Sequence, residues 1–542
     1  MINLEIYRRE RKKKLDQEIL EYIKKEPSDH YENVFKIDKR WEVFYHLSQM
    51  RTSILNWYDF KENSEILEIG GGFGALTGLL CKKCAKVVTF EASEIRAEGI
   101  KIRYKEKDNL KIVSGTYAEE FLENEKFDYV FFNGEEFFEN RCLDKEEYIK
   151  LFQKVRSLLK EDGIMLFSGD NRYGIRYFCG EVEPKTGCPF LGINGDSEIA
   201  GYLFSRSQLM DYIHKAGFPD CKFYYPMPSN QFPQLIYSDE YLPQKDICER
   251  LVFYYRNLNS LVASERNLYA DILDNHAFQF MANSFLVECG KRQNFSEAIY
   301  AAVSTDRGRE HSFATVVCRG DIVKKMALYS EGKRNEDIIF QNLMDLKEHG
   351  LKIVPHKKEN NGLSMPYMKE ITFSDYLRNL VLERDNKKFV KLLDRLYTQI
   401  LQSSEHEDEK KSEFPIKEGE NLKLGVILRK AYIDMVPFNC FYKDGEFYFF
   451  DQEFVRDYYP AAYTMFRAIK YTYLSIPETQ TLVPIEQLKE KYQLEKNWEV
   501  FEEEEKRFVN SNRRYDVYEG FYSWTFIDGN RMKKNAESLS MD

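Results

Sequence analysis

The stretch LEIGGGFGALT, residues 67–77, decides the fold of the first half of the chain. An apolar run typical of a buried strand ends in alternating glycines, and helix-forming residues follow. Glycine allows the positive φ angles that let a ligand lie against the backbone. Glu68 precedes the glycines, and a carboxylate there suits a cationic ligand better than a pyrophosphate, which it would repel. The next predicted strand ends at Glu91, where an acidic side chain can accept hydrogen bonds from both hydroxyls of a ribose.

Apolar runs and helical segments alternate on both sides of this stretch. After EILEIG come the runs AKVVTFEAS, NLKIVSG, KFDYVFFNG and GIMLFSGDN, with segments such as EEYIKLFQKVRSLLKEDG between them. This alternation predicts a parallel sheet whose ligands bind at the carboxyl ends of the strands. We predict a helical segment over residues 1–60 and an α/β domain over 61–292, closed by the strand in FMANSFLVECGKR. A mostly helical insertion is expected at about 229–275.

The order of an acidic residue, three alternating glycines and a second acidic residue resembles the class I S-adenosylmethionine-dependent methyltransferases, over about residues 35–292. The resemblance implies S-adenosylmethionine as the cofactor. It implies these positions: Glu68, Gly70, Gly72 and Gly74 around the methionine part, Glu91 at the ribose, Thr116 and Tyr117 near the adenine, and Asn133 and Gly134 along the reaction face. Two alternatives stay open, a related fold that binds a dinucleotide and an inactive fold of the same type.

No strong catalytic base stands out in this half. The segment SGDNRYGIRYFCG follows the fifth predicted strand, at a carboxyl end where polar residues usually contact the acceptor. Its Arg172 and Arg176 can bind a phosphate or a carboxylate by bidentate pairing. Arg172 is therefore the candidate catalytic residue of this half. The alternative is that both arginines only pair with a nearby acidic loop.

The second half contains AYIDMVPFNCFYKDGEFYFFDQEF, residues 431–454. Asn439 follows Asp434 by five residues, and a predicted hairpin that turns at Lys443-Asp444-Gly445 ends in Asp451. Phosphoryl transfer needs an acid that orients the acceptor hydroxyl, together with ligands for the metal ions that neutralise the triphosphate. The three side chains supply these groups.

This segment resembles the catalytic and metal-binding loops of the protein-kinase-like fold, nearer to its small-molecule and sugar kinases because Gln452-Glu453 replaces Phe-Gly. The resemblance implies ATP and Mg²⁺ as cofactors. It implies these roles: Asp434 as the catalytic acid, Asn439 and Asp451 as magnesium ligands, Lys325 or Lys324 at the phosphates, and Glu336 as the partner of that lysine. The loop STDRGREHSF has one glycine where three are usual, and Tyr432-Ile433 replaces His-Arg. An inactive, pseudokinase-type domain therefore stays open.

The expected fold class is α/β, a Rossmann-like class I methyltransferase domain followed by a two-lobed protein-kinase-like α+β domain over 293–542. This pair resembles bifunctional methyltransferase–kinases that cap bacterial surface polysaccharides by phosphorylating a terminal sugar and methylating the phosphate. The resemblance implies a glycan or sugar-phosphate acceptor and a cytoplasmic protein, with peripheral association with a membrane-bound glycan assembly complex. Two alternatives stay open: a methyltransferase whose kinase-like half only binds, and a non-enzymatic scaffold.

Composition limits the range of partners. The chain has 542 residues, too many for one core, and its 43% hydrophobic and 31% charged residues are typical of soluble globular proteins. A net charge of −10 disfavours a nucleic-acid partner, because binding phosphodiester chains needs clustered positive charge. The ten cysteines are scattered, and we expect free thiols. A zinc or redox role of the CKKC at 81–84 is the less favoured alternative.

Overall fold

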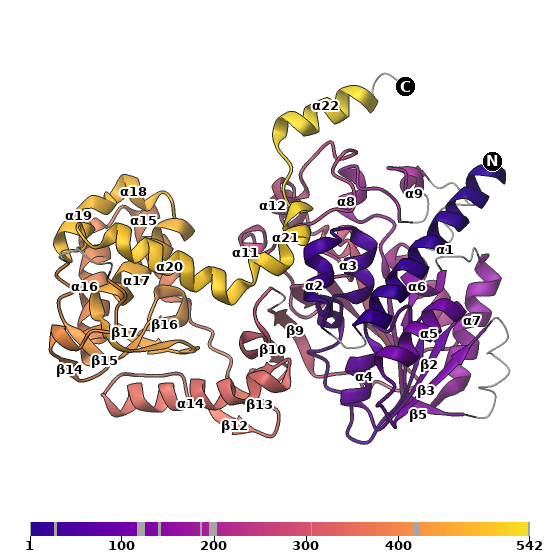
Figure 1. The fold of residues 1–542 in the computed structure, drawn as a ribbon, viewed down its shortest axis with the longest axis horizontal. Coiled ribbons are helices and arrows are strands. Elements are labelled where there is room, and N and C mark those ends of the chain that lie inside the picture. Colours follow the sequence, from indigo (N-terminus) through magenta and orange to yellow (C-terminus); the bar gives the residue numbers. More distant parts are fainter. Residues whose placement is uncertain are drawn as a thin grey trace. The chain divides into compact units, whose positions relative to one another are not determined.

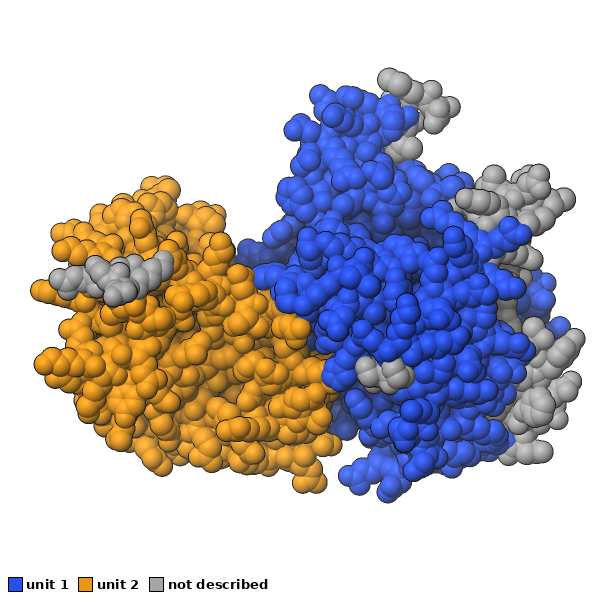
Figure 2. Space-filling model, in the orientation of Figure 1, with its two compact units in different colours: residues 1–306, 515–542 blue, residues 307–514 orange. Residues whose placement is uncertain are grey.

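A computed structural model describes most of the chain in two compact units, which are coloured separately in Figure 2. Unit 1 contains residues 1–306 and 515–542, and unit 2 contains residues 307–514. The described residues are 2–26, 30–115, 125–138, 143–184, 187–194, 203–304, 306–416 and 422–539. Among them, none of the helices has the length and apolar character that crossing a membrane requires.

Unit 1 is built on one mixed β-sheet, whose strand order is β9-β7-β6-β8-β5-β4-β1-β2-β3. The first five strands pair in parallel, and β8 runs antiparallel between β5 and β6. The strands are β1 (Glu65–Ile69), β2 (Lys86–Glu91), β3 (Leu110–Ser114), β4 (Phe127–Asn133), β5 (Leu159–Asp170), β6 (Asp220–Met227), β7 (Leu235–Ser238), β8 (Ser284–Gly290) and β9 (Ala298–Val303). The predicted parallel sheet and its alternation with helices are confirmed.

Helices cover this sheet, and the helical prediction for residues 1–60 is also confirmed (Figure 1). Local signals account for several helix starts: Ser93 accepts a hydrogen bond from the backbone of Arg96, and Asp144 forms a capping box with Glu147. The main helices are α1 (Ile2–Lys25), α2 (Glu32–Ile37), α3 (Trp41–Leu47), α4 (Thr77–Lys83), α5 (Glu94–Arg103), α6 (Gly134–Phe138), α7 (Lys145–Leu158), α8 (Ile175–Phe178), α9 (Leu191–Asn194) and α10 (Arg206–Lys215).

The region after β6 differs from its prediction. The expected mostly helical insertion at 229–275 contains strand β7 and only short helices, among them α11 (Ile247–Arg250) and α12 (Tyr269–Asp274). Unit 1 also does not close at residue 292, because β9 continues its sheet by antiparallel pairing with β7. Tyr237 of β7 is buried in this sheet, where aromatic residues pack well.

The C-terminal segment was predicted to belong with residues 293–514, but the structure includes it in unit 1. Helix α21 (Tyr515–Ser523) places Phe521 in stacked contact with Phe44, with 5.6 Å between the ring centroids. Trp524 lies 5.0 Å from Trp41 by the same measure. Burial of these aromatic rings attaches the segment to α3.

Unit 2 begins with an antiparallel sheet of order β12-β13-β11-β10. The turn between β10 and β11 has φ of +80° at Gly320 and +57° at Asp321. These elements are β10 (Phe313–Cys318), β11 (Ile322–Ala327), α14 (Lys333–Glu348), β12 (Lys357–Glu359) and β13 (Gly362–Pro366).

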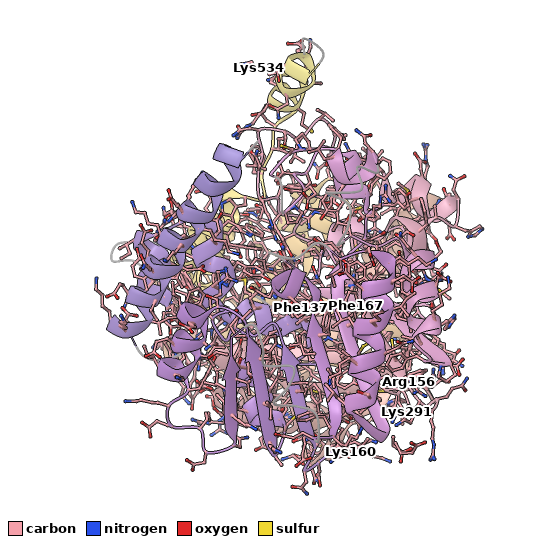
Figure 3. The ribbon with its side chains drawn as sticks, turned by 90° about the vertical axis from the view of Figure 1, so that its right-hand side faces the viewer. Phe137, Arg156, Lys160, Phe167, Lys291 and Lys534 are labelled. Carbon is pink, nitrogen blue, oxygen red and sulfur yellow. The ribbon has the colours of Figure 1, made fainter. Side chains whose placement is uncertain are left out.

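Figure 3, a side view of the ribbon, places Phe167 of unit 1 toward the upper ends of the strands and Lys160 and Lys291 at the lower ends.

The rest of unit 2 is mainly helical around a single apolar core. The predicted hairpin is present as β16 (Cys440–Lys443) and β17 (Glu446–Phe449), turning at Asp444 and Gly445, which both have positive φ. The helices are α15 (Phe373–Glu383), α16 (Asn386–Gln402), α17 (Ala461–Ser475), α19 (Ile485–Lys491) and α20 (Trp498–Arg513), and the other strands are β15 (Ile427–Tyr432) and β18 (Val455–Pro460). The short strand β14 (His406–Glu407) pairs with β15.

Candidate functional site

The glycine loop between β1 and α4 has the backbone that its sequence predicted. Gly70, Gly72 and Gly74 have φ of +83°, +54° and +83°, which side-chain-bearing residues rarely adopt. The amides of Gly70 and Gly71 donate to the carbonyl of Phe90, at 3.0 and 3.3 Å. The loop is thereby fastened to the end of β2, and its remaining backbone faces the carboxyl edge of the sheet.

Glu91 ends β2 as predicted and binds the same loop. Its Oε2 accepts from the amide of Gly72 at 2.7 Å, and its Oε1 accepts from the amide of Ser93 at 2.8 Å. Two backbone donors therefore hold the carboxylate in one orientation at the mouth of the site. A fixed carboxylate at this position can accept the hydroxyls of a ribose.

Glu68 lies beneath the loop and is only 1% exposed. Its Oε2 accepts from the hydroxyls of Thr77 at 2.6 Å and Thr89 at 2.8 Å. Burial raises the pKa of Glu68 to about 7, although the two hydroxyls lower it in part. In this structure Glu68 supports the loop from below and joins β1, β2 and α4.

A cavity of about 500 Å³ opens above the loop, between the loop, α1 and the start of α5. Gly70 and Glu91 line it, together with Lys12, Lys13 and Asp16 of α1, Glu136 and Phe137 of α6, and Phe90 with residues 92–96. Added side chains would crowd its floor, since a Cβ on Gly70 would lie 3.0 Å from the carbonyl oxygen of Asn133. A loop without side chains, a fixed carboxylate and this volume suit S-adenosylmethionine.

The sequence reasoning missed a buried charge network beside this cavity. Arg96 donates from Nε to Asp16 at 3.0 Å and from Nη1 to Glu136 at 2.7 Å. Glu136 also reaches the loop, because a Cβ on Gly72 would lie 3.0 Å from its Cδ. No local pattern reveals this contact, since α1, α5 and α6 are far apart in sequence.

Four further predicted cofactor residues and the two cysteines of CKKC remain to be placed in this half of the chain. Asn133 ends β4 with its Nδ2 3.5 Å from the carbonyl of Gly70, so it lies beside the glycine loop. Gly134 packs tightly, since an added Cβ would lie 2.7 Å from the carbonyl of Ser168. Thr116 and Tyr117 lie outside the described residues. Cys81 and Cys84 are buried, and neither forms a disulfide within the described residues.

The two arginines after β5 make protein contacts. Arg172 donates from Nε to the carbonyl of Gly192 at 2.8 Å and does not line the cavity above the glycine loop. Arg176 is buried, donates to the carbonyl of Tyr254 at 2.8 Å and lies 3.5 Å from Glu181. The contact with Glu181 is an acidic pairing of the kind that the alternative describes.

In unit 2 the predicted catalytic acid and the two predicted magnesium ligands lie together. Asp434, Asn439 and Asp451 line one cavity of about 280 Å³. Asn439 donates from Nδ2 to the backbone carbonyl of Asp434 at 3.2 Å. Asp451 has φ of +54° and forms an ion pair with Lys325. Strained φ angles often mark functional positions.

Glu336 does not pair with Lys325. Its Oε1 accepts from the amide of Ala327 at 2.6 Å, and Lys333 lies 3.2 Å away. The predicted lysine–glutamate contact is therefore wrong for this conformation, because Lys333, three residues earlier on α14, is the nearer cation.

Asp434 is held by its own unit on both carboxylate oxygens. Oδ2 accepts from the amides of Glu453 and Phe454 at 3.1 and 2.8 Å, and Oδ1 accepts from Arg467 at 3.1 Å. Arg467 also donates to Glu505 at 2.9 Å. All three charged groups are buried, so each depends on the others for its neutralisation.

Replacing Arg467 by methionine should lower the free energy of unfolding by about 3 kcal/mol or more, because Asp434 and Glu505 would remain buried without their cation. Urea denaturation measures this. Lys470→Met on the same helix is the control: its partner Glu502 is exposed, and the expected loss is below about 1 kcal/mol. Equal effects of the two substitutions would contradict the structural role of Arg467.

The predicted magnesium site of unit 2 depends on which side-chain oxygens lie together. Among the described residues, no group of three or more His, Cys, Asp or Glu is placed to hold a metal ion. Asn439 and Asp451 nevertheless offer two oxygens in one cavity, and Mg²⁺ commonly takes its other ligands from water and phosphate. The residues therefore fit Mg²⁺ with a bound nucleotide better than Mg²⁺ alone.

Comparison with known proteins agrees with the fold of unit 1. Residues 66–163 match the family model described as "Methyltransferase domain". The ribosomal RNA small subunit methyltransferase A of Borreliella burgdorferi is 32% identical over 97 residues, 18% of this chain and 34% of the relative, and that of Borreliella afzelii matches equally. The chain thus spans about a third of the length of these relatives.

Solved structures with detectable similarity include a SAM-dependent methyltransferase of Thermotoga maritima, 16% identical, covering 48% of this chain and 98% of that one with a TM-score of 0.28. Phosphoethanolamine N-methyltransferase 1 of Haemonchus contortus is 17% identical, covering 30% and 33%, with a TM-score of 0.21. From the matched segment, the strand order and the glycine loop, we conclude that residues 66–163 carry a class I S-adenosylmethionine-dependent methyltransferase domain.

Proposed function

We propose that unit 1 transfers a methyl group from S-adenosylmethionine. The observation that carries this proposal is the glycine loop whose Gly72 amide holds the Glu91 carboxylate beside the 500 Å³ cavity. Gly70 and Gly72 would border the methionine part, and Glu91 would hold the ribose. Bound S-adenosylmethionine supplies an electrophilic methyl group, and the protein orients it toward the acceptor.

Titration calorimetry of the whole chain with S-adenosylmethionine tests the binding step. One site per chain and detection of S-adenosylhomocysteine after incubation with an acceptor extract would support transfer. A chain that shows no heat of binding up to millimolar concentration would contradict the proposal. The same sample is then titrated with ATP and Mg²⁺.

We further propose that unit 2 binds ATP with Mg²⁺ and phosphorylates the end of a bacterial glycan, which unit 1 modifies. Support comes from the shared cavity of Asp434, Asn439 and Asp451 and from the pairing of Lys325 with Asp451. Asn439 and Asp451 would hold the metal, and Lys325 would contact phosphate oxygens. A glycan acceptor would place the protein in the cytoplasm beside a membrane-bound assembly complex.

A second candidate, a unit 2 that binds nucleotide without transferring phosphate, is favoured by one observation. Two backbone amides and Arg467 already occupy the Asp434 carboxylate, which limits its access to an acceptor hydroxyl. Incubation with γ-labelled ATP and a glycan extract separates the two. Label in the glycan supports the kinase, whereas metal-dependent binding with no transfer supports the binding module. Binding of S-adenosylmethionine and ATP with no transfer of a methyl group or a phosphate would support the non-enzymatic scaffold.

A further inference from the structure

Two buried oxygen atoms near the carboxyl end of β5 have no hydrogen-bond partner among the described residues. One is Oδ1 of Asp170, whose Oδ2 accepts from the hydroxyl of Tyr177 at 3.0 Å. The other is Oδ1 of Asn230, whose Nδ2 donates to the hydroxyl of Ser168 at 3.2 Å. Asp170 is 8% exposed and Asn230 2%. A buried acceptor left unsatisfied is costly and calls for an explanation.

Both side chains lie at the carboxyl end of β5, where Asp170 ends the strand and Asn230 donates to Ser168. Ser168 and Asp170 are alternate residues of β5, so their side chains share one face of the sheet. Ser168 pairs with Asn133 of β4, whose amide lies beside the glycine loop. The unsatisfied oxygens thus lie one strand away from the methyl-donor site, at the carboxyl edge where acceptors bind.

Helix α6 links the two sites. Its Glu136 contacts the glycine loop, and the preceding Glu135 accepts from Gln231 at 2.7 Å and from Tyr45 at 3.1 Å and forms an ion pair with Arg256. The negative charge of Glu135 also raises the pKa of Asp170. The region therefore presents two carboxylates and an amide oxygen that accept hydrogen bonds, and Arg256 is the counter-ion of Glu135.

We propose that Asp170 and Asn230 form the acceptor subsite and that the methylated group is a hydroxyl, not a phosphate oxygen, whose proton passes to Oδ1 of Asp170. In this step the acceptor's O–H bond breaks and its oxygen forms the bond to the methyl carbon. The carbon–sulfur bond of the donor breaks, and its electron pair stays on sulfur. The inference rests on the proposed methyl transfer and goes beyond it by naming the acceptor group, which differs from the phosphate that the capping enzymes methylate.

The electrostatics of Asp170 suit this role. Burial and, to a smaller extent, the charge of Glu135 raise the pKa of Asp170 to about 6, although Arg176, Arg256 and the Tyr177 hydroxyl oppose the rise. Above pH 7 the carboxylate is therefore mostly ionised and can take a proton, and a base with a pKa near the working pH is the most effective kind.

The first test needs no acceptor. Because the folded pKa is raised above the usual 3.8, the ionised carboxylate of Asp170 disfavours folding as pH rises from about 4 through 6. Asp170→Asn should therefore raise the thermal unfolding midpoint at pH 8 by about 3 °C or more, with a smaller gain at pH 5. Asp211→Asn, whose partner Lys215 is exposed, is the control and should give no gain. A lower midpoint of the Asp170 variant at pH 8 would show that Oδ1 has a structural partner and would overturn the inference.

The second test follows the methyl group. Wild type and Asp170→Asn receive S-adenosylmethionine with a ¹³C-labelled methyl group and a glycan extract of the cells that encode the chain, and the product is treated with hydrofluoric acid, which cleaves phosphodiesters. We expect the label to stay on the sugar as an ether. The variant should lose about 100-fold or more in rate and lose the rise in rate through pH 6.

The outcomes separate this inference from the proposed function. Label released as methanol would overturn the hydroxyl assignment while leaving methyl transfer intact. Label on nitrogen would overturn it in favour of an amine. Equal rates and pH profiles in both proteins would remove Asp170 as the proton acceptor. Failure of the wild-type protein to bind S-adenosylmethionine or to transfer any label would refute the proposed function, and the inference would fall with it.

Discussion

Replacing Gly72 by aspartate should weaken S-adenosylmethionine binding by at least about 100-fold, the equivalent of about 3 kcal/mol. Two effects add. The position has φ of +54°, a left-handed conformation that glycine adopts more readily than aspartate. The Cβ of the new side chain would also lie 3.0 Å from the carboxyl carbon of Glu136. Glu91 is a second close carboxylate, because it accepts a hydrogen bond from the amide of residue 72. The negative charge of the new side chain would therefore face two others.

Titration calorimetry of the variant measures this loss. The chain offers a matched control in Gly529→Asp, because Gly529 has no positive φ and a Cβ there would meet nothing within 4 Å. The control should bind as wild type does. Circular dichroism of both variants establishes that they are folded. Binding within threefold of wild type by a folded Gly72→Asp protein would exclude the glycine loop as the methyl-donor site.

Replacing Asp451 by asparagine should abolish magnesium-dependent ATP binding by unit 2, with a loss of about 100-fold in affinity. The substitution removes the charge that faces the metal and leaves Lys325 without its ion pair. Asparagine tolerates a positive φ as aspartate does, so the backbone angle of +54° adds little cost. S-adenosylmethionine binding should stay unchanged, since its proposed site contains only residues of unit 1.

Calorimetric titration with ATP, with and without Mg²⁺, distinguishes the outcomes. Asp457→Asn is the control, an exposed aspartate on β18 of the same unit. ATP binding that does not depend on metal, or that is equal in the Asp451 variant and wild type, would refute the assignment of Asp451 as a metal ligand. Absence of ATP binding in wild type would leave unit 2 without a nucleotide role.

Much of both sites could be predicted from sequence because their main parts are local. The glycine loop follows β1 directly and Glu91 ends the next strand, so strand and helix periodicity were enough to place both at one edge. In unit 2, a short turn and a hairpin separate Asp434, Asn439 and Asp451, and a hairpin brings its ends together wherever it occurs.

Only the tertiary structure decided which distant residues complete these sites. Asp16, Arg96 and Glu136 come from three helices, and Asn230 reaches β5 from beyond β6, so no sequence spacing relates them. The C-terminal aromatics show the same limit. Phe521 and Trp524 are large apolar side chains that favour burial, but their sequence does not show which core buries them. Burial of apolar area is non-directional, and the choice depends on the shape of the surface that receives it.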